Sequence, residues 1–425
     1  MEIVQPTKQQ LEWQDQEIGV IIHYFLAKHY MTNECRANIH TLGKEVRNIN
    51  RPEDFELPHP DPDQWVRVAK EMGANYAVLV AKHGDGFCLW PSKKTDYTVG
   101  SMSWENGCRD LVREFIDACK KYGVKPGIYY CLNHNDYYGV NGPESVDFNS
   151  EFYNEYLEFV AAQLTELWTE YGELFEIWFD GGVLPESKID ITGMLKKYQP
   201  NAICFQGPRN YPQNLRWVGN ERGFAPEVCF SATSYDEDNF TGTVEDEKVG
   251  VGSLYGRYYH PAESDMSNRY QWASENGWGW AAGEGHLIYS PEELLERYIH
   301  TVGRNSNLLI GMSIAKDGFF EDEQQFISFG KLLKKHFGTP IQISKELTLC
   351  TEEPKQISYI VIREDITRGQ RINTFEVLAD GKLIYSGKSI GHKRIIETEN
   401  LTASKIELRV TDAVEDWKLR DITIL

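Results

Sequence analysis

The sequence has little positive charge, no long apolar run and no nucleotide-binding fingerprint. Its 44 Lys and Arg residues stand against 64 Asp and Glu residues, and the formal net charge of −20 argues against nucleic acid or an anionic membrane surface as a partner. No apolar stretch approaches the ~18 residues of a membrane-spanning helix, so we expect no membrane insertion. No G-x-G-x-x-G follows a predicted strand, which argues against a dinucleotide-binding sheet.

Cysteine usage and the first residues bear on cofactors and compartment. The eight cysteines are scattered and contain no C-x-x-C pair, so their spacing predicts neither a disulfide framework nor a zinc site. We therefore expect no metal ion and no organic cofactor. Residues 1–6 lack the basic and apolar regions of a signal peptide. We expect a cytoplasmic protein, or a periplasmic or secreted one if a leader was removed.

Alternation of strands and helices is the main pattern of the first 338 residues. Apolar strands of the buried type are predicted at residues 17–24, 76–83 and 125–132, and stretches such as 109–122 have helical spacing. Continuous apolar strands joined by helices predict a parallel sheet buried on both faces. We expect a (β/α)8-type barrel over residues 1–338, with a doubly wound open sheet as the alternative.

A different pattern begins after the barrel. Residues 339–425 consist of short alternating stretches separated by turns such as the one at residues 379–381. This pattern predicts a small C-terminal β-sandwich domain. The expected fold class is therefore α/β, a barrel followed by a β-sandwich.

Polar and aromatic side chains stand where the predicted strands end. Because the carboxyl ends of barrel strands meet at one rim, we expect His23, His83 and Asp180 to converge there. Asp180 ends an apolar strand, where a carboxylate is costly unless it is paired or used, and two glycines after it allow a ligand to approach closely. Capping of a helix or pairing with a lysine is the structural alternative for Asp180.

A second carboxylate is expected from the long irregular stretch at residues 208–250, since such loops are often functional. Glu221 lies there beside Trp217 and flexible glycines, and an ion pair with Arg222 is its structural alternative. Glu263 and Glu284 are rival candidates for the acid. Two carboxyl groups facing one sugar are what glycoside hydrolysis requires.

The abundant aromatic residues, 12% of the chain, suit a sugar-binding site, although large cores also use them. Trp272, Trp278 and Trp280 could stack on sugar rings or pack the barrel exterior. His23 and His83 could also be metal ligands, but the first strand has no H-x-H pair. We expect the two histidines to hydrogen-bond a polyhydroxylated ligand.

Several segments, in order, resemble the α-L-fucosidases of glycoside hydrolase family 29. Residues 82–92, KHGDGFCLWPS, resemble the family's histidine segment after the second strand, and residues 216–223, RWVGNERG, resemble the loop of the subgroup that cleaves α-1,3/1,4-linked fucose. The other similar segments are residues 19–24, 125–130, 178–181, 261–265 and 302–309.

The resemblance implies a retaining exo-α-L-fucosidase that releases α-1,3/1,4-linked fucose from Lewis-type oligosaccharides. It implies that Asp180 is the nucleophile and Glu221 the acid/base. The residues expected to bind the fucosylated oligosaccharide are His23, Glu34, His83, Tyr130, Trp178, Trp217 and Glu263.

The chain departs from the family pattern at two positions. Gly84 stands where a second histidine is usual, and Cys35 where a tryptophan often follows the glutamate. These departures leave two alternatives open. One is a barrel glycosidase for a related 6-deoxy or galacto-configured sugar, and the other is a carbohydrate-binding relative without catalytic activity.

Overall fold

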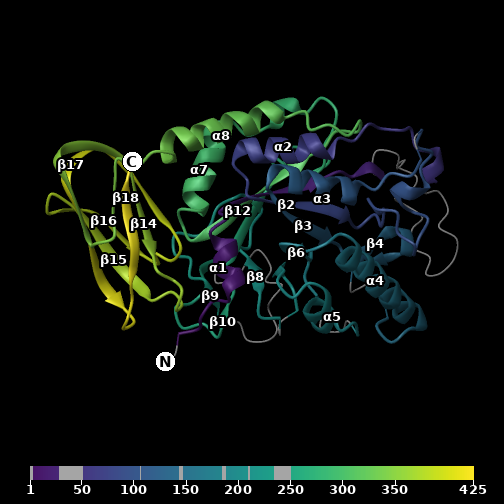
Figure 1. Ribbon diagram of the computed structural model, residues 1–425, viewed down its shortest axis with the longest axis horizontal. Coiled ribbons are helices and arrows are strands. Elements are labelled where there is room, and N and C mark those ends of the chain that lie inside the picture. Colours follow the sequence, from purple (N-terminus) through teal and green to yellow (C-terminus); the bar gives the residue numbers. More distant parts are fainter. Residues whose placement is uncertain are drawn as a thin grey trace.

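A closed barrel and a C-terminal β-sheet make up the computed structural model, which describes residues 3–27, 51–105, 107–142, 147–183, 188–208, 211–233 and 250–425. Figure 1 shows the barrel and its helices on one side of the molecule and the sheet on the other. No helix in these ranges is long and apolar enough to cross a membrane.

Eight parallel strands close the barrel, so the predicted barrel is confirmed and the open sheet is wrong. The first strand pairs with the second and also with the last, where Ile18 lies opposite Leu308 and His23 opposite Ser313. Every position of the first strand is buried, as expected for a strand covered on both faces. The strands in chain order are β1 (Ile18–His23), β2 (Tyr76–Lys82), β3 (Lys125–Tyr130), β6 (Glu176–Trp178), β7 (Ile203–Phe205), β8 (Asn214–Trp217), β11 (Ala262–Met266) and β12 (Ser306–Ser313).

Helices cover the outside of most strand pairs, and local capping fixes where they begin and end. The Asp61 side chain accepts a hydrogen bond from the Gln64 backbone at the start of α2, and Gly73 ends that helix with φ 105°. The connection between β7 and β8, residues 206–213, is too short for a covering helix. The helices around the barrel are α2 (Pro62–Met72), α3 (Leu111–Tyr122), α4 (Glu151–Glu170), α5 (Ile191–Tyr198), α7 (Pro291–Thr301) and α8 (Glu323–Phe337).

A short N-terminal helix, α1 (Lys8–Gln14), covers the amino-terminal end of the barrel. A capping box between Thr7 and Gln10 starts it. The Gln10 amide donates to the backbone oxygens of Asn214 and Tyr259, and the Trp13 indole donates to Glu176 inside the barrel. This end of the barrel is therefore closed by side chains that contact its interior.

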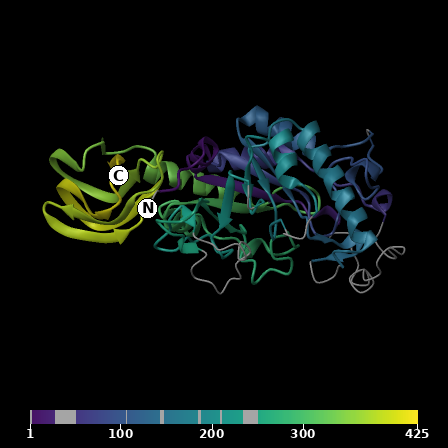
Figure 2. The ribbon, with the colours of Figure 1, turned by 90° about the horizontal axis from the view of Figure 1, so that it is seen from below.

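The C-terminal strands form one antiparallel sheet in the order β13-β18-β14-β17-β15-β16. Figure 2 shows that this sheet is curved. Its apolar core includes Ile360, Phe375 and Leu408. Bulges in the two longest strands allow this curvature. The separate β domain agrees with the prediction. Its strands are β13 (Gln342–Ser344), β14 (Thr348–Glu364), β15 (Ile372–Ala379), β16 (Lys382–Lys388), β17 (Arg394–Ala413) and β18 (Leu419–Ile424).

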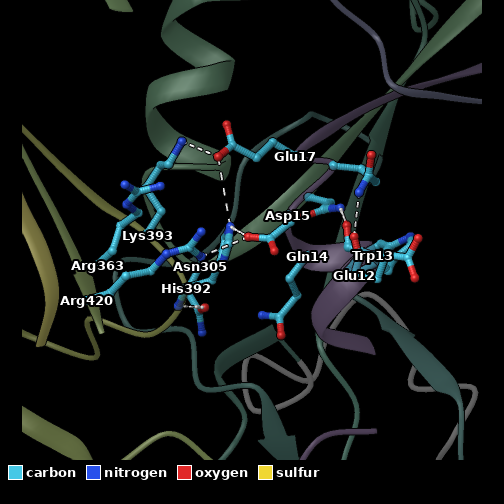
Figure 3. A network of polar contacts seen from close by, with 12 residues as sticks. Glu12, Trp13, Gln14, Asp15, Glu17, Asn305, Arg363, His392, Lys393 and Arg420 are labelled. Atoms are coloured by element: carbon cyan, nitrogen blue, oxygen red, sulfur yellow. Dashed lines mark hydrogen bonds and ion pairs between the residues drawn. The ribbon is translucent and has the colours of Figure 1, made fainter. Parts of the chain in front are cut away.

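Polar contacts join the sheet to the barrel (Figure 3). Glu17, just before β1, accepts hydrogen bonds from Lys393 and from the Tyr298 hydroxyl. Burial alone would raise the pKa of Glu17, but Lys393 and His392 beside it hold that pKa below its ordinary value. The backbone joins as well, since Ile395 donates to the Gly303 carbonyl at 3.0 Å. The two parts are therefore connected by both charges and main chain.

Candidate active site

A cavity of about 230 Å³ lies at the carboxyl ends of the barrel strands. Its walls come from strands that are far apart in the chain and from the loops that follow them, which is where barrel enzymes place their chemistry. Larger hollows on the protein, such as the one between α4 and α5, are lined by surface side chains. The residues that line the cavity are Ile21, His23, Phe25, His83, Tyr129, Trp178, Asp180, Glu221, Asp265, Asn276, Gly277 and Trp278.

Asp180 follows β6 at the entrance of this cavity and is exposed. The Tyr129 hydroxyl donates to its Oδ2 at 2.7 Å. Gly181 and Gly182 adopt φ values of 70° and 74°, and the Asn133 amide donates to the Gly182 carbonyl, which fixes the turn. No Lys or Arg of the described ranges pairs with Asp180, and α5 is capped by another residue, Asp190. The Tyr129 hydroxyl therefore orients the Asp180 carboxylate toward the cavity.

Glu221 reaches the same cavity from the loop after β8. Backbone N–H groups of Val218 and Gly223 donate to the carbonyls of Glu263 and Asp265, so the loop is fixed along β11. The Gln271 amide donates to Glu221 Oε2 at 2.6 Å. The neighbouring Arg222 is exposed, and among described residues no ion pair joins it to Glu221. The two carboxyls of the prediction thus line one cavity.

Aromatic rings frame the two histidines. His23 lies 5.1 Å from Trp278 between ring centroids, and His83 is stacked with Tyr129 at 5.9 Å. The Nδ1 atom of His23 is 3.2 Å from the Ile21 carbonyl, an acceptor only, so a neutral His23 carries its proton there and has Nε2 as an acceptor. The site thus combines imidazole edges with flat apolar faces.

Trp178 forms part of this frame. Its ring stacks on Phe205 with centroids 3.8 Å apart and on Tyr129 at 5.4 Å. Its indole N–H donates to Glu263 Oε1 at 2.9 Å. The ring is therefore held on its face by other rings and at its edge by a carboxyl.

Three of the residues predicted to bind substrate do not line the cavity. Tyr130 donates its hydroxyl to Gln163 of α4, outside the barrel, so its neighbour Tyr129 takes the inward position. Trp217 lies beside the cavity and donates to Asp265 Oδ1 at 2.7 Å. Glu263 lies beneath the cavity. Glu34 is outside the described residues.

Buried carboxyls lie inside the barrel below the site. Glu263 is fully buried and also accepts a 2.7 Å hydrogen bond from Tyr76, while Glu176, equally buried, accepts one from Trp13. Burial raises the pKa of Glu263 to about 7. Burial, and then the neighbouring Glu263, raise the pKa of Glu176 well above its ordinary value. Both groups therefore tend to keep protons.

Several cavity residues were not predicted from sequence, among them Tyr129, Asp265 and Asn276. The strict alternation of side chains along a strand places Tyr129 and Tyr130 on opposite faces, so only one of the two can point inward, but alternation does not say which one. Of the three tryptophans with open roles, Trp278 lines the cavity and Trp280 donates to Glu321. Trp272 is 73% exposed.

The arrangement can carry out acid–base and nucleophilic chemistry. Two carboxyls, the exposed Asp180 and the half-buried Glu221, face a small space that aromatic rings and the buried Asp265 also line. Among the residues that the structure describes, no Lys or Arg lines it. Within the ranges that the structure describes, no group of three or more His, Cys, Asp or Glu side chains is placed to hold a metal ion. The rival acid Glu284 accepts bonds from Ser274 and Glu275 and does not line the cavity.

Comparison with known proteins gives consistent matches. The family profile described as Alpha-L-fucosidase matches residues 3–336. Alpha-L-fucosidase 1 of Arabidopsis thaliana is 29% identical over 96% of this chain and 84% of its own length. Putative alpha-L-fucosidase 1 of Oryza sativa subsp. japonica is 27% identical over 97% and 83%.

Solved structures agree in fold over the whole chain. A crystal structure of a putative alpha-L-fucosidase from Bacteroides thetaiotaomicron VPI-5482 has a TM-score of 0.87 and 29% identity, and covers 100% of this chain and 99% of that one. A glycoside hydrolase 29 family member from an unknown rumen bacterium has a TM-score of 0.81 and 28% identity, with 99% and 77% covered.

Proposed function

The chain belongs to the α-L-fucosidase family of glycoside hydrolases, and we propose that it is a retaining exo-α-L-fucosidase that releases α-1,3/1,4-linked fucose from Lewis-type oligosaccharides. The observation that carries this proposal is the meeting of Asp180 and Glu221 in one cavity. We assign catalysis to residues 1–338 and the β-sheet domain to residues 339–425.

The size of the cavity supports removal of a single terminal sugar. Its volume of about 230 Å³ is below the ~300–1,000 Å³ of pockets that enclose drug-sized ligands. Phe25 and Trp278 offer apolar faces for C–H groups and for the methyl group of a 6-deoxy sugar, and His23 and His83 offer polar edges for its hydroxyls.

The proposed reaction has two steps. In the first, an Asp180 oxygen attacks the anomeric carbon, the bond from that carbon to the leaving oxygen breaks, and Glu221 gives its proton to that oxygen. In the second, water attacks the same carbon and gives its proton to Glu221, and the bond to Asp180 breaks. Tyr129 orients the nucleophile and Gln271 orients the acid/base.

The linkage preference is supported by the loop that carries Glu221. Its sequence, RWVGNERG at residues 216–223, resembles that of the subgroup acting on α-1,3/1,4-linked fucose. Hydrolysis of Lewis trisaccharides should therefore exceed that of α-1,2-fucosyllactose by at least tenfold in kcat/KM. Equal rates on both, or a preference for α-1,2-fucosyllactose, would contradict the linkage assignment.

The nucleophile is tested with Asp180→Ala and an aryl α-L-fucoside. We expect kcat to fall by about 10³-fold or more and to return in part with azide, which replaces the missing nucleophile. NMR of the sugar released by the wild type should show the α-anomer first. First release of the β-anomer would refute retention, and unchanged turnover of the variant would remove Asp180 from the mechanism.

A related 6-deoxy or galacto-configured sugar is the second candidate substrate, and Gly84 favours testing it. A Cβ atom at Gly84 would lie 3.2 Å from the Cβ of His134, so a side chain there would be tightly placed. The site thus lacks one polar group that the family pattern supplies. A panel of aryl glycosides that differ at one hydroxyl decides between the sugars.

A further inference from the structure

Acidic residues alternate along β11, and both point into the barrel. Glu263 and Asp265 are two positions apart, so their side chains lie on the same face of the strand. Glu263 is fully buried beneath Trp178, whereas Asp265 is 4% exposed and lines the cavity. Asp265 is therefore a third carboxyl of the site, beside Asp180 and Glu221.

Asp265 is fixed in place by neutral groups. The Trp217 indole donates to its Oδ1 at 2.7 Å, and its backbone carbonyl accepts from Gly223, at the end of the loop that carries Glu221. In the part of the chain that the structure describes, no Lys or Arg lines the cavity and none forms an ion pair with Asp265. Its carboxyl therefore accepts from the neutral Trp217 N–H and, among the described residues, is paired with no opposite charge.

The surroundings of Asp265 disfavour a negative charge. Burial, and then the nearby carboxyls of Glu221 and Glu263, raise the pKa of Asp265 well above its ordinary value. Asp180 is more exposed, and water there screens its charge. The surroundings of Asp265 therefore favour its protonated form.

We propose that Asp265 is a substrate-binding residue that acts as a neutral carboxylic acid and donates a hydrogen bond to a hydroxyl of the bound sugar. This inference rests on the proposed function. A neutral carboxyl has one O–H donor and keeps acceptor capacity, so it can pair with a hydroxyl in either sense, whereas a carboxylate only accepts. Glu263 cannot take this part, because its two oxygens already accept from Tyr76 and Trp178.

The decisive measurement is L-fucose binding across pH, followed by the fluorescence of the tryptophans at the site. The wild type should bind about tenfold more weakly at pH 9 than at pH 6, because ionised Asp265 no longer donates. The other titratable groups that face it are Glu221 from the loop after β8, Glu263 on β11, Asp180 after β6, and His23 and His83. The contribution of these groups to the pH dependence of binding remains when Asp265 alone is replaced, so the change on replacement reports Asp265.

Asp265→Asn and Asp265→Ala separate the neutral from the charged role. The asparagine keeps an N–H donor and an acceptor, so we expect binding within about threefold of the wild type at pH 6 and a weaker dependence on pH. The alanine leaves the sugar hydroxyl and the Trp217 N–H unpaired, so we expect binding about 10²-fold weaker at every pH. Glu364→Gln is the matched control, since that buried carboxyl also has a raised pKa, of about 7, but lies in the C-terminal sheet.

The outcomes distinguish this inference from the proposed function. If Asp265→Asn binds L-fucose as weakly as Asp265→Ala, or keeps the full pH dependence of the wild type, the neutral-donor role is overturned. Fucoside turnover by the wild type would still uphold the proposed function. A wild type that neither binds L-fucose nor hydrolyses an aryl fucoside overturns both. If Asp265→Ala does not fold, the comparison of the wild type with Asp265→Asn decides alone.

Discussion

Replacement of Glu263 tests whether the carboxyl beneath Trp178 supports the floor of the site. Glu263 accepts one hydrogen bond from Tyr76 and one from Trp178, and all three side chains are buried. Glu263→Ala leaves both donors without an acceptor, at ~1–3 kcal/mol each, so the free energy of unfolding should fall by about 2–6 kcal/mol. Glu263→Gln keeps one acceptor oxygen and leaves one of the two donors unpaired, so it should lose only about 1–3 kcal/mol.

The pH dependence of stability gives a second, independent signature. Burial raises the pKa of Glu263 from 4.5 to about 7, so the folded protein holds a proton that the unfolded chain has already released. For such a group the stabilising contribution is complete below pH 4.5 and is lost as the pH rises through about 7. A shift of this size corresponds to about 3 kcal/mol. The wild type should therefore lose about 3 kcal/mol relative to Glu263→Gln between pH 4.5 and pH 8.

Urea unfolding at pH 5 and pH 8, followed by tryptophan fluorescence, measures both effects. The difference in stability between the wild type and Glu364→Gln should change with pH in the same way, because wild-type Glu364 also has a raised pKa, of about 7. This variant should leave fucoside hydrolysis unchanged. Glu263→Gln should raise KM through a displaced Trp178. A difference between wild type and Glu263→Gln that is the same at both pH values would refute the retained proton, and an alanine variant as stable as the glutamine variant would refute the counting of hydrogen bonds.

Three further predictions follow from single contacts. Tyr129→Phe removes the hydroxyl that donates to Asp180, the proposed nucleophile, and should lower kcat about tenfold. Tyr130→Phe, the matched change on the outward face, should leave kcat unchanged, and equal effects would contradict the assignment of faces. Gln271→Ala should slow fucosides with poor leaving groups more than those with good ones, because Glu221 loses its amide partner, and a uniform loss on both would contradict that role. Lys393→Met should lower stability by about 1–3 kcal/mol in thermal unfolding, since it removes a charged hydrogen-bond donor from the half-buried Glu17 carboxylate, and unaltered stability would show that the contact contributes nothing.

The barrel and its catalytic rim were predictable from sequence where apolar patterns are continuous. β1 and β2 are runs of buried residues, and helices such as α3 follow a regular spacing that ends at a left-handed glycine. Asp180 was found because it interrupts such a run. Glu221 was a candidate because it lies in a long irregular stretch, and the resemblance of its loop suggested its role. Its place beside the cavity depends on backbone contacts with β11 that no local pattern encodes.

Polar strands account for most of what the sequence did not reveal. β11 reads Ala-Glu-Ser-Asp-Met yet is buried at all five positions, because Tyr76, Trp178 and Trp217 satisfy its acidic groups from other strands. These hydrogen-bond partners lie more than 40 residues away in the chain, so the local sequence around the two acidic residues does not predict a buried strand. The choice of Tyr130 over Tyr129 failed for a simpler reason, since only the pairing of β3 fixes which tyrosine faces inward.

The contacts between the sheet and the barrel have a consequence for how the protein can be divided. A chain shortened to end at residue 338 would keep every cavity residue but would lose Val361 and Ile395, which pack in the same apolar core as the barrel, and would leave the Glu17 carboxylate without Lys393. It would also leave the Gly303 carbonyl without the N–H of Ile395. Loss of activity in such a fragment would thus report damage to the barrel itself and would say nothing about sugar recognition by the sheet.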